Sequence, residues 1–309
     1  MPAIAFEGTF TAIVTPFCDN AANATGPIDW HAYDRLILAQ LEANVDGIVP
    51  CGTTGEGPAL DTREKLELFE RTVKLAKGKA TIVAGTGSNS TRASIELSQA
   101  AERAGVDAVM VVVPYYNKPT QEGLVEHFVA IARSVQCPVV VYNVPGRTGI
   151  DLAASTLAKI AERCPNVVAT KEATGNVLRT QEIVRTMGDR MTVISGDDGL
   201  TLPMIAVGAR GVISVTSNVY PAEVRHATRL ALGGQFTAAR RAHFALMPVH
   251  EIMFVEASPG PAKAALAHKG MIQEVVRGPL VTVSPAARAK IRKTLIDYEE
   301  HKKHEGDPA

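Results

Sequence analysis

A lysine ends a short apolar segment of this 309-residue chain, in a position suited to nucleophilic chemistry. The segment Asn166–Lys171 is rich in β-branched residues and leads directly into the polar turn Glu172–Gly175, which predicts a buried strand. Apolar walls around such a strand end would disfavour the ammonium form of Lys171 and leave an amine able to attack a carbonyl. Adjacent residues of a strand point to opposite faces, so Glu172 should not neutralise this amine. Alternatively, Lys171 only extends to solvent from the strand end.

A glycine-rich turn, Gly52–Gly57, follows another apolar segment and contains two adjacent threonines. Exposed backbone N–H groups beside the hydroxyls of Thr53 and Thr54 would converge on a small anion, which predicts a site for a carboxylate. An ordinary tight loop is the alternative interpretation.

Three of the six tyrosines also follow apolar segments, namely Tyr115, Tyr116 and Tyr142. A tyrosine in such a place can simply pack in the core or on the rim of a fold. Two predicted strands that deliver phenols to the end that holds a lysine favour acid–base chemistry instead, because phenols relay protons when threonine hydroxyls link them.

No spacing of residues predicts a metal ion or an organic cofactor. The pair Asp197–Asp198 has no histidine or further carboxylate nearby, and we expect it to cap the following helix. The eight histidines show no metal-ligand spacing at any predicted strand end. The loop Gly85–Ser90 looks like a dinucleotide-binding loop but lacks the third glycine. We therefore expect neither a metal nor a cofactor.

A repeated strand–helix unit would position these residues. Eight β-branched segments alternate with segments that have apolar residues at three- and four-residue spacing. Strict alternation predicts parallel strands, and eight units favour a closed (β/α)8 TIM barrel over an open doubly wound sheet, in which the carboxyl ends of all strands share one mouth. The predicted strands are Gly8–Thr15, Gly47–Cys51, Ala80–Ala84, Ala108–Val113, Val139–Tyr142, Val167–Lys171, Met191–Ser195 and Gly211–Val215.

Amphipathic helices are predicted between these strands. Asp29 should cap the first helix, and Gly78 and Gly105 should end two others. The clearest helical stretches are Asp29–Ala43, Arg63–Ala76, Arg92–Ala104, Gln121–Ser134, Ala153–Arg163 and Asn176–Met187.

The pattern of the chain changes after the eighth predicted strand. We expect residues 1–220 to form the catalytic barrel and residues 221–309 to supply the last barrel helix and a C-terminal helical extension packed on the barrel. From about Pro221 to Tyr298 the sequence predicts helix throughout, with interruptions at 258–261 and 283–285. This length predicts two or three additional helices.

The overall composition is that of an ordinary globular protein. Hydrophobic residues make up 46% of the chain, and 32 basic residues balance 32 acidic ones. A net charge of zero lacks the basic footprint of a protein that binds nucleic acid or an anionic membrane. No apolar stretch is as long as a membrane span, and the N-terminus lacks a signal-peptide pattern. The four scattered cysteines fit reduced thiols in a cytoplasmic protein.

Six motifs follow one another at a spacing that fits a barrel. They are Gly-Thr-Thr-Gly-Glu at 52–56, Pro-Tyr-Tyr-Asn-Lys-Pro at 114–119, Tyr-Asn-Val-Pro-Gly-Arg-Thr-Gly at 142–149, Lys-Glu-Ala-Thr-Gly at 171–175, Ser-Gly-Asp-Asp at 195–198 and Gly-Val-Ile-Ser-Val at 211–215. In these motifs the chain resembles the dihydrodipicolinate synthase family of the pyruvate-dependent lyase superfamily, from Gly8 to about Lys293. The segments that carry histidine and acidic residues in lysine-inhibited members differ here, which predicts weak or absent feedback by lysine.

The resemblance implies a condensation of pyruvate with L-aspartate 4-semialdehyde that needs no cofactor. Lys171 would form a Schiff base with pyruvate, and the resulting enamine would attack the semialdehyde. Tyr142 would be the acid–base group beside the imine, linked through the Thr54 hydroxyl to Tyr116 as a proton relay. In family tetramers the residue that matches Tyr116 reaches the site of a neighbouring subunit, which implies a homotetramer. The product would be 4-hydroxy-tetrahydrodipicolinate, on the route to lysine and diaminopimelate.

The resemblance also implies which residues hold the substrates. Thr53 and Thr54 would hold the pyruvate carboxylate. The planar guanidinium of Arg147 would bind the carboxylate of the semialdehyde. Gly196 and the backbone of Ile213 would line the pocket.

Two other functions remain open at this point. An N-acetylneuraminate lyase or a 2-keto-3-deoxy sugar acid aldolase would share Lys171, Tyr142 and the glycine turn. The position of Arg147 after Val-Pro-Gly, together with the Tyr115–Tyr116 pair, favours the synthase. A catalytically silent barrel that binds pyruvate or serves as a scaffold is the second alternative, and the intact set of reactive residues argues against it.

Overall fold

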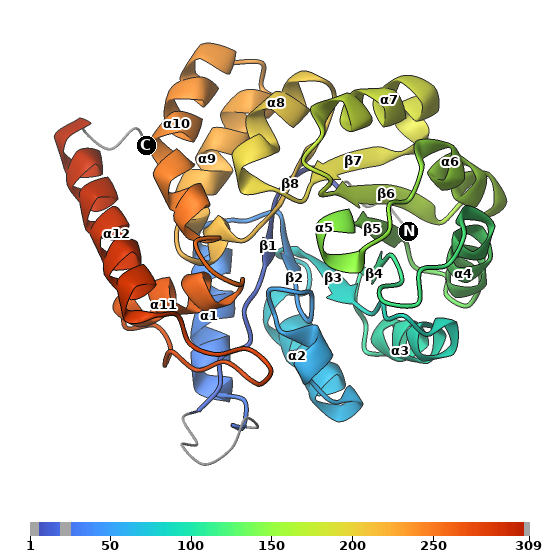
Figure 1. Cartoon of the computed structure of the whole chain (residues 1–309), viewed down its shortest axis with the longest axis horizontal. Coiled ribbons are helices and arrows are strands. Elements are labelled where there is room, and N and C mark those ends of the chain that lie inside the picture. The colour runs from blue at the N-terminus through green and yellow to red at the C-terminus, as the bar shows by residue number, and fades with distance from the viewer. Residues whose placement is uncertain (1–5, 19–25, 306–309) are drawn as a thin grey trace.

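Eight parallel strands close into a barrel in the computed structural model, which describes residues 6–18 and 26–305 (Figure 1). Each strand pairs with its neighbours in the sequence, and the last strand pairs with the first to complete the ring. The predicted TIM barrel is therefore confirmed. The strands are β1 (Gly8–Ala12), β2 (Gly47–Val49), β3 (Thr81–Gly85), β4 (Ala108–Val112), β5 (Val139–Asn143), β6 (Val167–Glu172), β7 (Thr192–Ser195) and β8 (Gly211–Ser214).

The first strand is shorter than the sequence predicts. We expected it to end at Thr15, but β1 ends at Ala12. The Val14 N–H donates to the side chain of Asn218 at 3.0 Å, and the Thr15 hydroxyl donates to the Gly55 carbonyl at 2.7 Å. The β-branched residues after Ala12 are therefore buried by loops at the barrel mouth rather than by a neighbouring strand.

Helices surround the strands, and the predicted helical stretches are confirmed to within one or two residues. Asp29 caps α1 by accepting a hydrogen bond from the Ala32 N–H at 2.9 Å. Gly78 and Gly105 adopt φ values of +78° and +90° just beyond α2 and α3, a conformation that favours glycine. The helices are α1 (Trp30–Glu42), α2 (Thr62–Ala76), α3 (Thr91–Arg103), α4 (Gln121–Arg133), α5 (Pro145–Thr148), α6 (Ala154–Arg163), α7 (Val177–Met187), α8 (Thr201–Ala206), α9 (Pro221–Leu232), α10 (Phe236–Ile252), α11 (Gly260–His268) and α12 (Pro285–Glu305).

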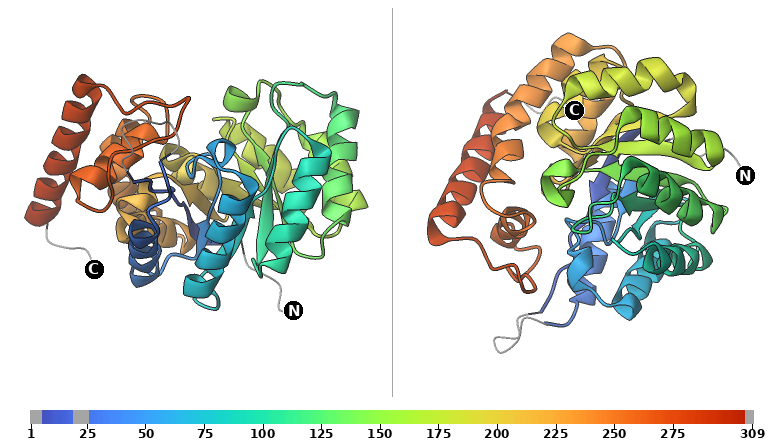
Figure 2. Two further views of the ribbon diagram at one scale, coloured as in Figure 1. Left: turned by 90° about the horizontal axis from the view of Figure 1, so that it is seen from below. Right: turned by 45° about the vertical axis from the view of Figure 1, so that its right-hand side comes forward.

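The helices after β8 follow one another along one side of the barrel. The helix α9 contacts β1 and β8, α10 contacts α9, and α12 contacts both α10 and α11. In both views of Figure 2, α12 lies at the outer edge, across the molecule from α3 and α4. Our expectation of helix from 221 to 298, interrupted only at 258–261 and 283–285, is wrong for residues 269–282, which contain no helix. Gly270 turns the chain after α11 with φ +69°, and Pro279 is a helix breaker.

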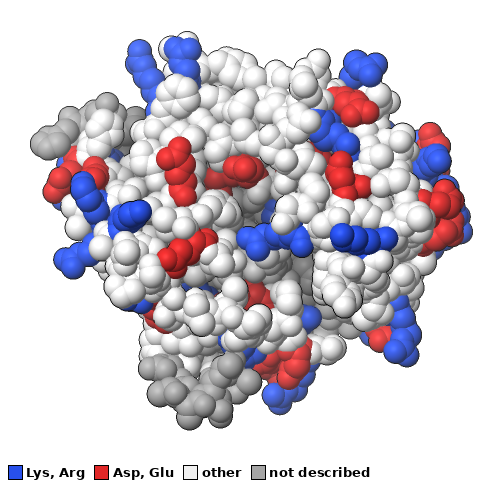
Figure 3. All heavy atoms as spheres, in the orientation of Figure 1, with Lys and Arg blue, Asp and Glu red and all other residues white. Residues whose placement is uncertain are grey.

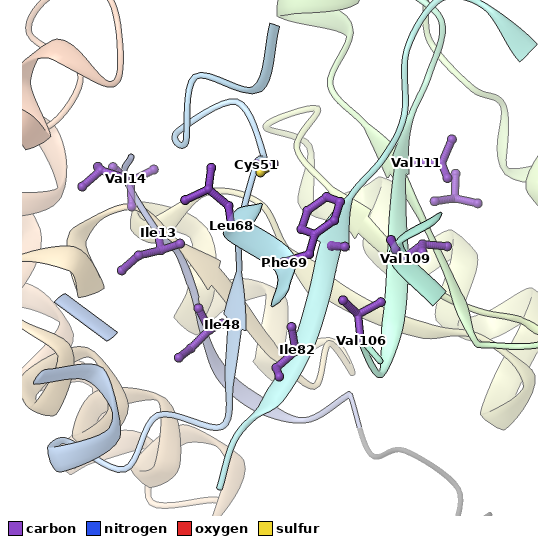
Figure 4. Close-up of a cluster of buried hydrophobic side chains, with 14 of the residues drawn as sticks. Ile13, Val14, Ile48, Cys51, Leu68, Phe69, Ile82, Val106, Val109 and Val111 are labelled. Carbon is purple, nitrogen blue, oxygen red and sulfur yellow. The ribbon is translucent and has the colours of Figure 1, made fainter. Parts of the chain in front are cut away.

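Alternate residues of each strand face either the barrel interior or the surrounding helices. Figure 4 shows part of the outer core, in which Leu68 and Phe69 of α2 lie beside Ile48 of β2 and Ile82 of β3. The interior holds a separate core, which the opposite faces of the strands supply. Its strand residues are Phe10, Ala12, Val49, Val83, Ala108, Met110, Val140, Tyr142, Ala169, Ile194 and Ile213.

Charged side chains are spread over the face of the molecule that Figure 3 shows. On the face in Figure 3, basic and acidic residues are interspersed. This distribution agrees with the balanced total of 32 basic and 32 acidic residues. Within residues 6–18 and 26–305, no helix has the length and apolar character needed to span a membrane.

Candidate active site

Lys171 lies at a buried position near the carboxyl end of β6. Its side chain faces the barrel interior, as does that of Ala169 two residues earlier. Only 5% of the residue is exposed, so the alternative that it extends to solvent is wrong. Its Nζ atom lies 4.3 Å from the centroid of the Tyr142 ring. In the described part of the chain, Lys171 has no ion pair with a carboxylate.

The strand register explains why the lysine and the phenol meet. Tyr142 of β5 pairs with Lys171 of β6, and Lys171 pairs in turn with Ile194 of β7. Paired residues of parallel strands point to the same side of a sheet. The three side chains therefore form one row across the interior of the barrel mouth.

Gly196, directly after β7, leaves the space that the Lys171 side chain occupies. A Cβ atom at this position would lie 2.7 Å from the Cβ of Ala173 and 3.1 Å from the Cε of Lys171. The Gly196 N–H donates to the Glu172 carbonyl at 2.8 Å, which holds the glycine against β6. Any larger residue would push into the stem of the lysine.

Glu172 points away from Lys171, as we expected for the next residue of a strand. Its carboxylate accepts hydrogen bonds from the Thr174 N–H at 2.8 Å and from the Asn143 side chain at 3.4 Å. Burial raises the pKa of Glu172 above its ordinary value, and these hydrogen bonds oppose that shift. The carboxylate thus belongs to a polar cluster behind the strand.

The glycine-rich turn after β2 is built by a close approach of backbone to backbone. A Cβ atom on Gly57 would lie 2.3 Å from the carbonyl oxygen of Cys51, so only glycine fits there. The Glu56 N–H donates to the Thr53 carbonyl at 3.0 Å and closes the turn. Thr54 is buried, whereas Thr53 is half-buried.

The tyrosines differ sharply in their surroundings. Tyr142 is 6% exposed and lies beside Lys171, whereas Tyr116 is 88% exposed and has a φ of +73°. No hydrogen bond joins Thr54 to either phenol within the residues that the structure describes. A single copy of the chain therefore brings Tyr142, but not Tyr116, to the lysine.

A cavity of about 280 Å³ opens beside Tyr142. Of the predicted site residues, Thr53, Tyr142 and Arg147 line it. Lys171 does not line this cavity, but its amine lies against the ring of Tyr142, which does. The lining residues are Cys51, Gly52, Thr53, Gly57, Pro58, Lys65, Gly85, Gly87, Ser88, Met110, Val112, Tyr115, Tyr142, Val144, Arg147 and Thr148.

Lys65 of α2 is a cavity residue that the sequence did not single out. Burial lowers the pKa of its amine below the ordinary value, while Cys51, Asp61 and Glu64 oppose the shift. Lys65 gives the cavity a second cationic residue besides Arg147. No local pattern could have revealed it, because a lysine in an amphipathic helix ordinarily belongs to the solvent face.

Arg147 lies on the single helical turn α5, at the rim of the cavity. Gly149 ends this turn with a φ of +72°. The ends of the loop are joined by Asn143, whose side chain donates to the Asp151 carboxylate at 2.8 Å and accepts from the Leu152 N–H at 3.2 Å. These hydrogen bonds close the loop and hold the exposed arginine at the cavity.

At the barrel mouth, the side chain of Ile213 packs in the core, and Asp197 and Asp198 form hydrogen bonds with backbone N–H groups. The side chain of Ile213 is 1% exposed and belongs to the interior core. Asp197 caps the turn that follows it by accepting from the Gly199 N–H at 2.9 Å, as we expected. The same expectation is wrong for Asp198, which is buried and accepts from the Val215 N–H at 2.8 Å, so that it joins the loop after β7 to β8.

The barrel and its motifs match known proteins over nearly the whole chain. The sequence profile of the Dihydrodipicolinate synthetase family matches residues 5–297. The chain belongs to the dihydrodipicolinate synthetase family. One relative, the 4-hydroxy-tetrahydrodipicolinate synthase of Sorangium cellulosum, is 50% identical over 97% of this chain and 98% of its own length.

Solved structures of dihydrodipicolinate synthetase family members agree in fold as well as in sequence. The 4-hydroxy-tetrahydrodipicolinate synthase of Methylacidiphilum fumariolicum SolV is 42% identical, with a TM-score of 0.94 over 97% of this chain and 98% of that one. The chloride-inhibited dihydrodipicolinate synthase of Acinetobacter baumannii, crystallised in complex with pyruvate, is 38% identical, with a TM-score of 0.92 over 96% and 99%.

The groups at the mouth of this family member are organic acids, bases and hydrogen-bond donors. No group of three or more His, Cys, Asp or Glu residues that could hold a metal ion occurs in residues 6–18 and 26–305. What the mouth does bring together is an amine, a phenol and a cavity with two cationic residues. Such a set suits the covalent capture of a carbonyl compound that carries a carboxylate.

Proposed function

We propose that this chain condenses pyruvate with L-aspartate 4-semialdehyde and forms 4-hydroxy-tetrahydrodipicolinate through a Schiff base on Lys171. The observation that carries the proposal is a buried lysine, 5% exposed, whose amine lies over a phenol ring at the mouth of a barrel. Membership of the family supports the identity of the reaction, as does the name of the 50% identical relative.

The reaction begins with attack of the neutral Lys171 amine on the ketone carbon of pyruvate. Loss of water gives an imine, and removal of a proton from the adjacent methyl group gives an enamine. The enamine carbon attacks the aldehyde carbon of the semialdehyde, which forms the new C–C bond and restores the imine. The amino group of the added substrate then attacks the imine carbon, closes the ring and releases Lys171. Tyr142 is the group placed to donate and accept the protons of these steps.

The two substrate carboxylates are held at different places. The hydroxyls of Thr53 and Thr54 and the N–H groups of their turn hold the carboxylate of pyruvate. Arg147 binds the carboxylate of the semialdehyde through its planar guanidinium. Gly196 leaves room for the lysine, and the backbone of Ile213 completes the pocket. Thr53 and Arg147 line one cavity of about 280 Å³, which supports their action on a single reacting pair.

Tyr116 completes a proton relay from Tyr142 through Thr54 in a neighbouring subunit of a homotetramer. Its 88% exposure leaves the phenol available to another subunit. On this proposal the enzyme works in the cytoplasm, in lysine and diaminopimelate biosynthesis, on small molecules alone. Tyr116→Phe should lower kcat while sedimentation still reports a tetramer, and a fully active monomer would contradict the relay.

The Schiff base is tested by borohydride reduction in the presence of pyruvate, followed by peptide mass spectrometry. We expect a single tag, on Lys171. Lys263 provides an internal control, because it is the other buried lysine among the described residues and is 0% exposed. A tag on Lys263, or no tag at all, would exclude the mechanism.

The second substrate is tested by Arg147→Ala. Loss of a hydrogen-bonded partner of a carboxylate should lower kcat/KM for the semialdehyde by about 100-fold or more. The rate of borohydride tagging by pyruvate should not change, because that step precedes the aldehyde. An unchanged rate with the semialdehyde, or faster turnover with sugar-derived aldehydes in the unmodified enzyme, would instead favour a sugar acid aldolase.

A further inference from the structure

Three buried charged side chains and one half-buried glutamate cluster outside the cavity, between the glycine-rich turn and the segment that contains α11. Lys263 of α11 is 0% exposed and forms an ion pair with Glu56, which is 3% exposed. The Lys263 amine also donates to the Val275 carbonyl at 2.8 Å and lies 4.1 Å from the centroid of the Phe17 ring. The amine is therefore enclosed by a carboxylate, a carbonyl and an aromatic face.

Arg277 also contacts the glycine-rich turn. Its backbone N–H donates to the Glu56 carboxylate at 2.8 Å. Its guanidinium lies 4.3 Å from the centroid of the Phe17 ring and forms two hydrogen bonds with the Glu64 carboxylate, at 2.6 and 2.7 Å. The Glu64 side chain also belongs to the capping box at the start of α2. Both ends of the stretch from Glu56 to Glu64 are thus held by the segment after α11.

This network surrounds a residue, Glu56, whose backbone conformation is unfavourable. Glu56 has a φ of +53°, a left-handed conformation that is unfavourable for a residue with a side chain. Its N–H closes the turn on the Thr53 carbonyl at 3.0 Å. The conformation of Thr53 and Thr54 therefore depends on a strained neighbour, and that neighbour keeps its place only while its buried carboxylate has a partner.

The buried charges of Lys263 and Glu56 stabilise each other. Burial lowers the pKa of Lys263 to about 8, and the attraction of Glu56 opposes this shift. Without Lys263 the Glu56 carboxylate would keep only the hydrogen bond from the Arg277 N–H, and it would be drawn toward water because a buried charge without an ion-pair partner is strongly unfavourable. Expulsion of Glu56 would carry the turn with it.

We propose that Lys263 is a positioning residue for the binding of pyruvate: it holds Glu56 in the left-handed conformation and so fixes the hydroxyls and N–H groups of Thr53 and Thr54. The proposal rests on the proposed function, in which this turn holds the carboxylate of pyruvate. It assigns a role in the site to α11, which does not line the cavity.

The test is Lys263→Met, which keeps the length of the side chain and removes its charge. We expect the KM for pyruvate to rise by about tenfold or more, because displacement of a binding group by about 1 Å weakens its contacts substantially. The KM for the semialdehyde should change by less than about twofold, since Arg147 lies on another loop. Borohydride should still tag Lys171 completely when pyruvate is saturating.

Two further variants separate positioning from stability. Glu56→Gln should raise the KM for pyruvate in the same way, and the double variant Glu56→Gln/Lys263→Met should raise it less than either single change, because neutral partners leave no buried charge. Lys269→Met is the matched control: Lys269 pairs with Glu299 at 3.1 Å, away from the turn, so both KM values should remain unchanged.

The results that would overturn the role of Lys263 differ from those that would refute the proposed function. A lower unfolding temperature of Lys263→Met with an unchanged KM for pyruvate would overturn the proposal, as would an equal rise in both KM values. If Lys263→Met does not fold, Glu56→Gln decides, and an unchanged KM for pyruvate in that variant overturns the proposal. Failure of the unmodified enzyme to be tagged at Lys171 would refute the proposed function instead.

Discussion

Replacement of Gly196 by alanine tests whether the space around the lysine stem determines its reactivity. The new Cβ would lie 2.7 Å from the Ala173 Cβ and 3.1 Å from the Lys171 Cε. Carbon atoms in contact prefer separations of about 3.5 Å or more, so the substitution is about 0.8 Å too close to one neighbour and about 0.4 Å too close to the other. The interior core of the barrel is packed on all sides, and overpacking of this kind typically costs about 1–3 kcal/mol.

The displaced side chain should be the lysine stem, because Ala173 is fixed by its backbone. A shift of the amine by a sizeable fraction of 1 Å lowers the rate of attack on a carbonyl by up to about 100-fold, equivalent to about 2.7 kcal/mol in activation free energy. We therefore expect Gly196→Ala to lower the rate of borohydride tagging and kcat together, with a smaller effect on the KM for pyruvate.

A matched control lies three residues further along the same loop. A Cβ on Gly199 would meet its nearest neighbours at 3.5 Å or more, which is ordinary contact, so Gly199→Ala should be tagged at the normal rate. Thermal unfolding would establish that both variants are folded. If folded Gly196→Ala were tagged as fast as the unmodified enzyme, the reasoning from the packing of Lys171 would be refuted.

Two further predictions concern the loop of Arg147 and the dependence of stability on pH. Asn143→Ala removes the hydrogen bonds to Asp151 and Leu152 that close the loop, so the KM for the semialdehyde should rise by about tenfold while the KM for pyruvate stays the same; a rise in the KM for pyruvate would contradict the assignment of this loop to the second substrate. Burial lowers the pKa of His127 to about 4 from an ordinary value of 6.5. Between these pH values the unfolded state binds a proton and the folded state does not, so the free energy of unfolding should fall as the pH falls through this window, by up to about 3 kcal/mol. Urea unfolding at pH 7 and pH 4.5 should give a smaller difference in His127→Gln than in the unmodified protein, and equal differences would exclude this source of acid sensitivity.

Much of the barrel could be predicted from local patterns. Seven of the eight predicted strands agree with the structure to within about two residues, because short β-branched segments between turn residues have few other ways to be buried. The burial of Lys171 and the outward direction of Glu172 could also be predicted, since both follow from the two-residue period of a strand.

Other features depended on residues that are far apart in the sequence. The segment 269–282 was expected to be helical, but its backbone binds Lys263 and Glu56 instead. Lys65 gave no sign of being a cavity residue, because its sequence neighbours indicate a solvent-facing helix. In both cases the deciding partner lies outside the window over which periodicity is informative.

The sequence by itself determined the eight strand–helix units and the family, and it predicted the reactive residues, because these depend on local spacing and on side-chain chemistry. Only the tertiary structure decided how these residues meet. The register of β5, β6 and β7 brought Tyr142 to Lys171, the absence of a side chain at Gly196 made room for the amine, and Lys263 reached the glycine turn across most of the chain. Packing and buried charge act between neighbours in space, so no local pattern encodes them.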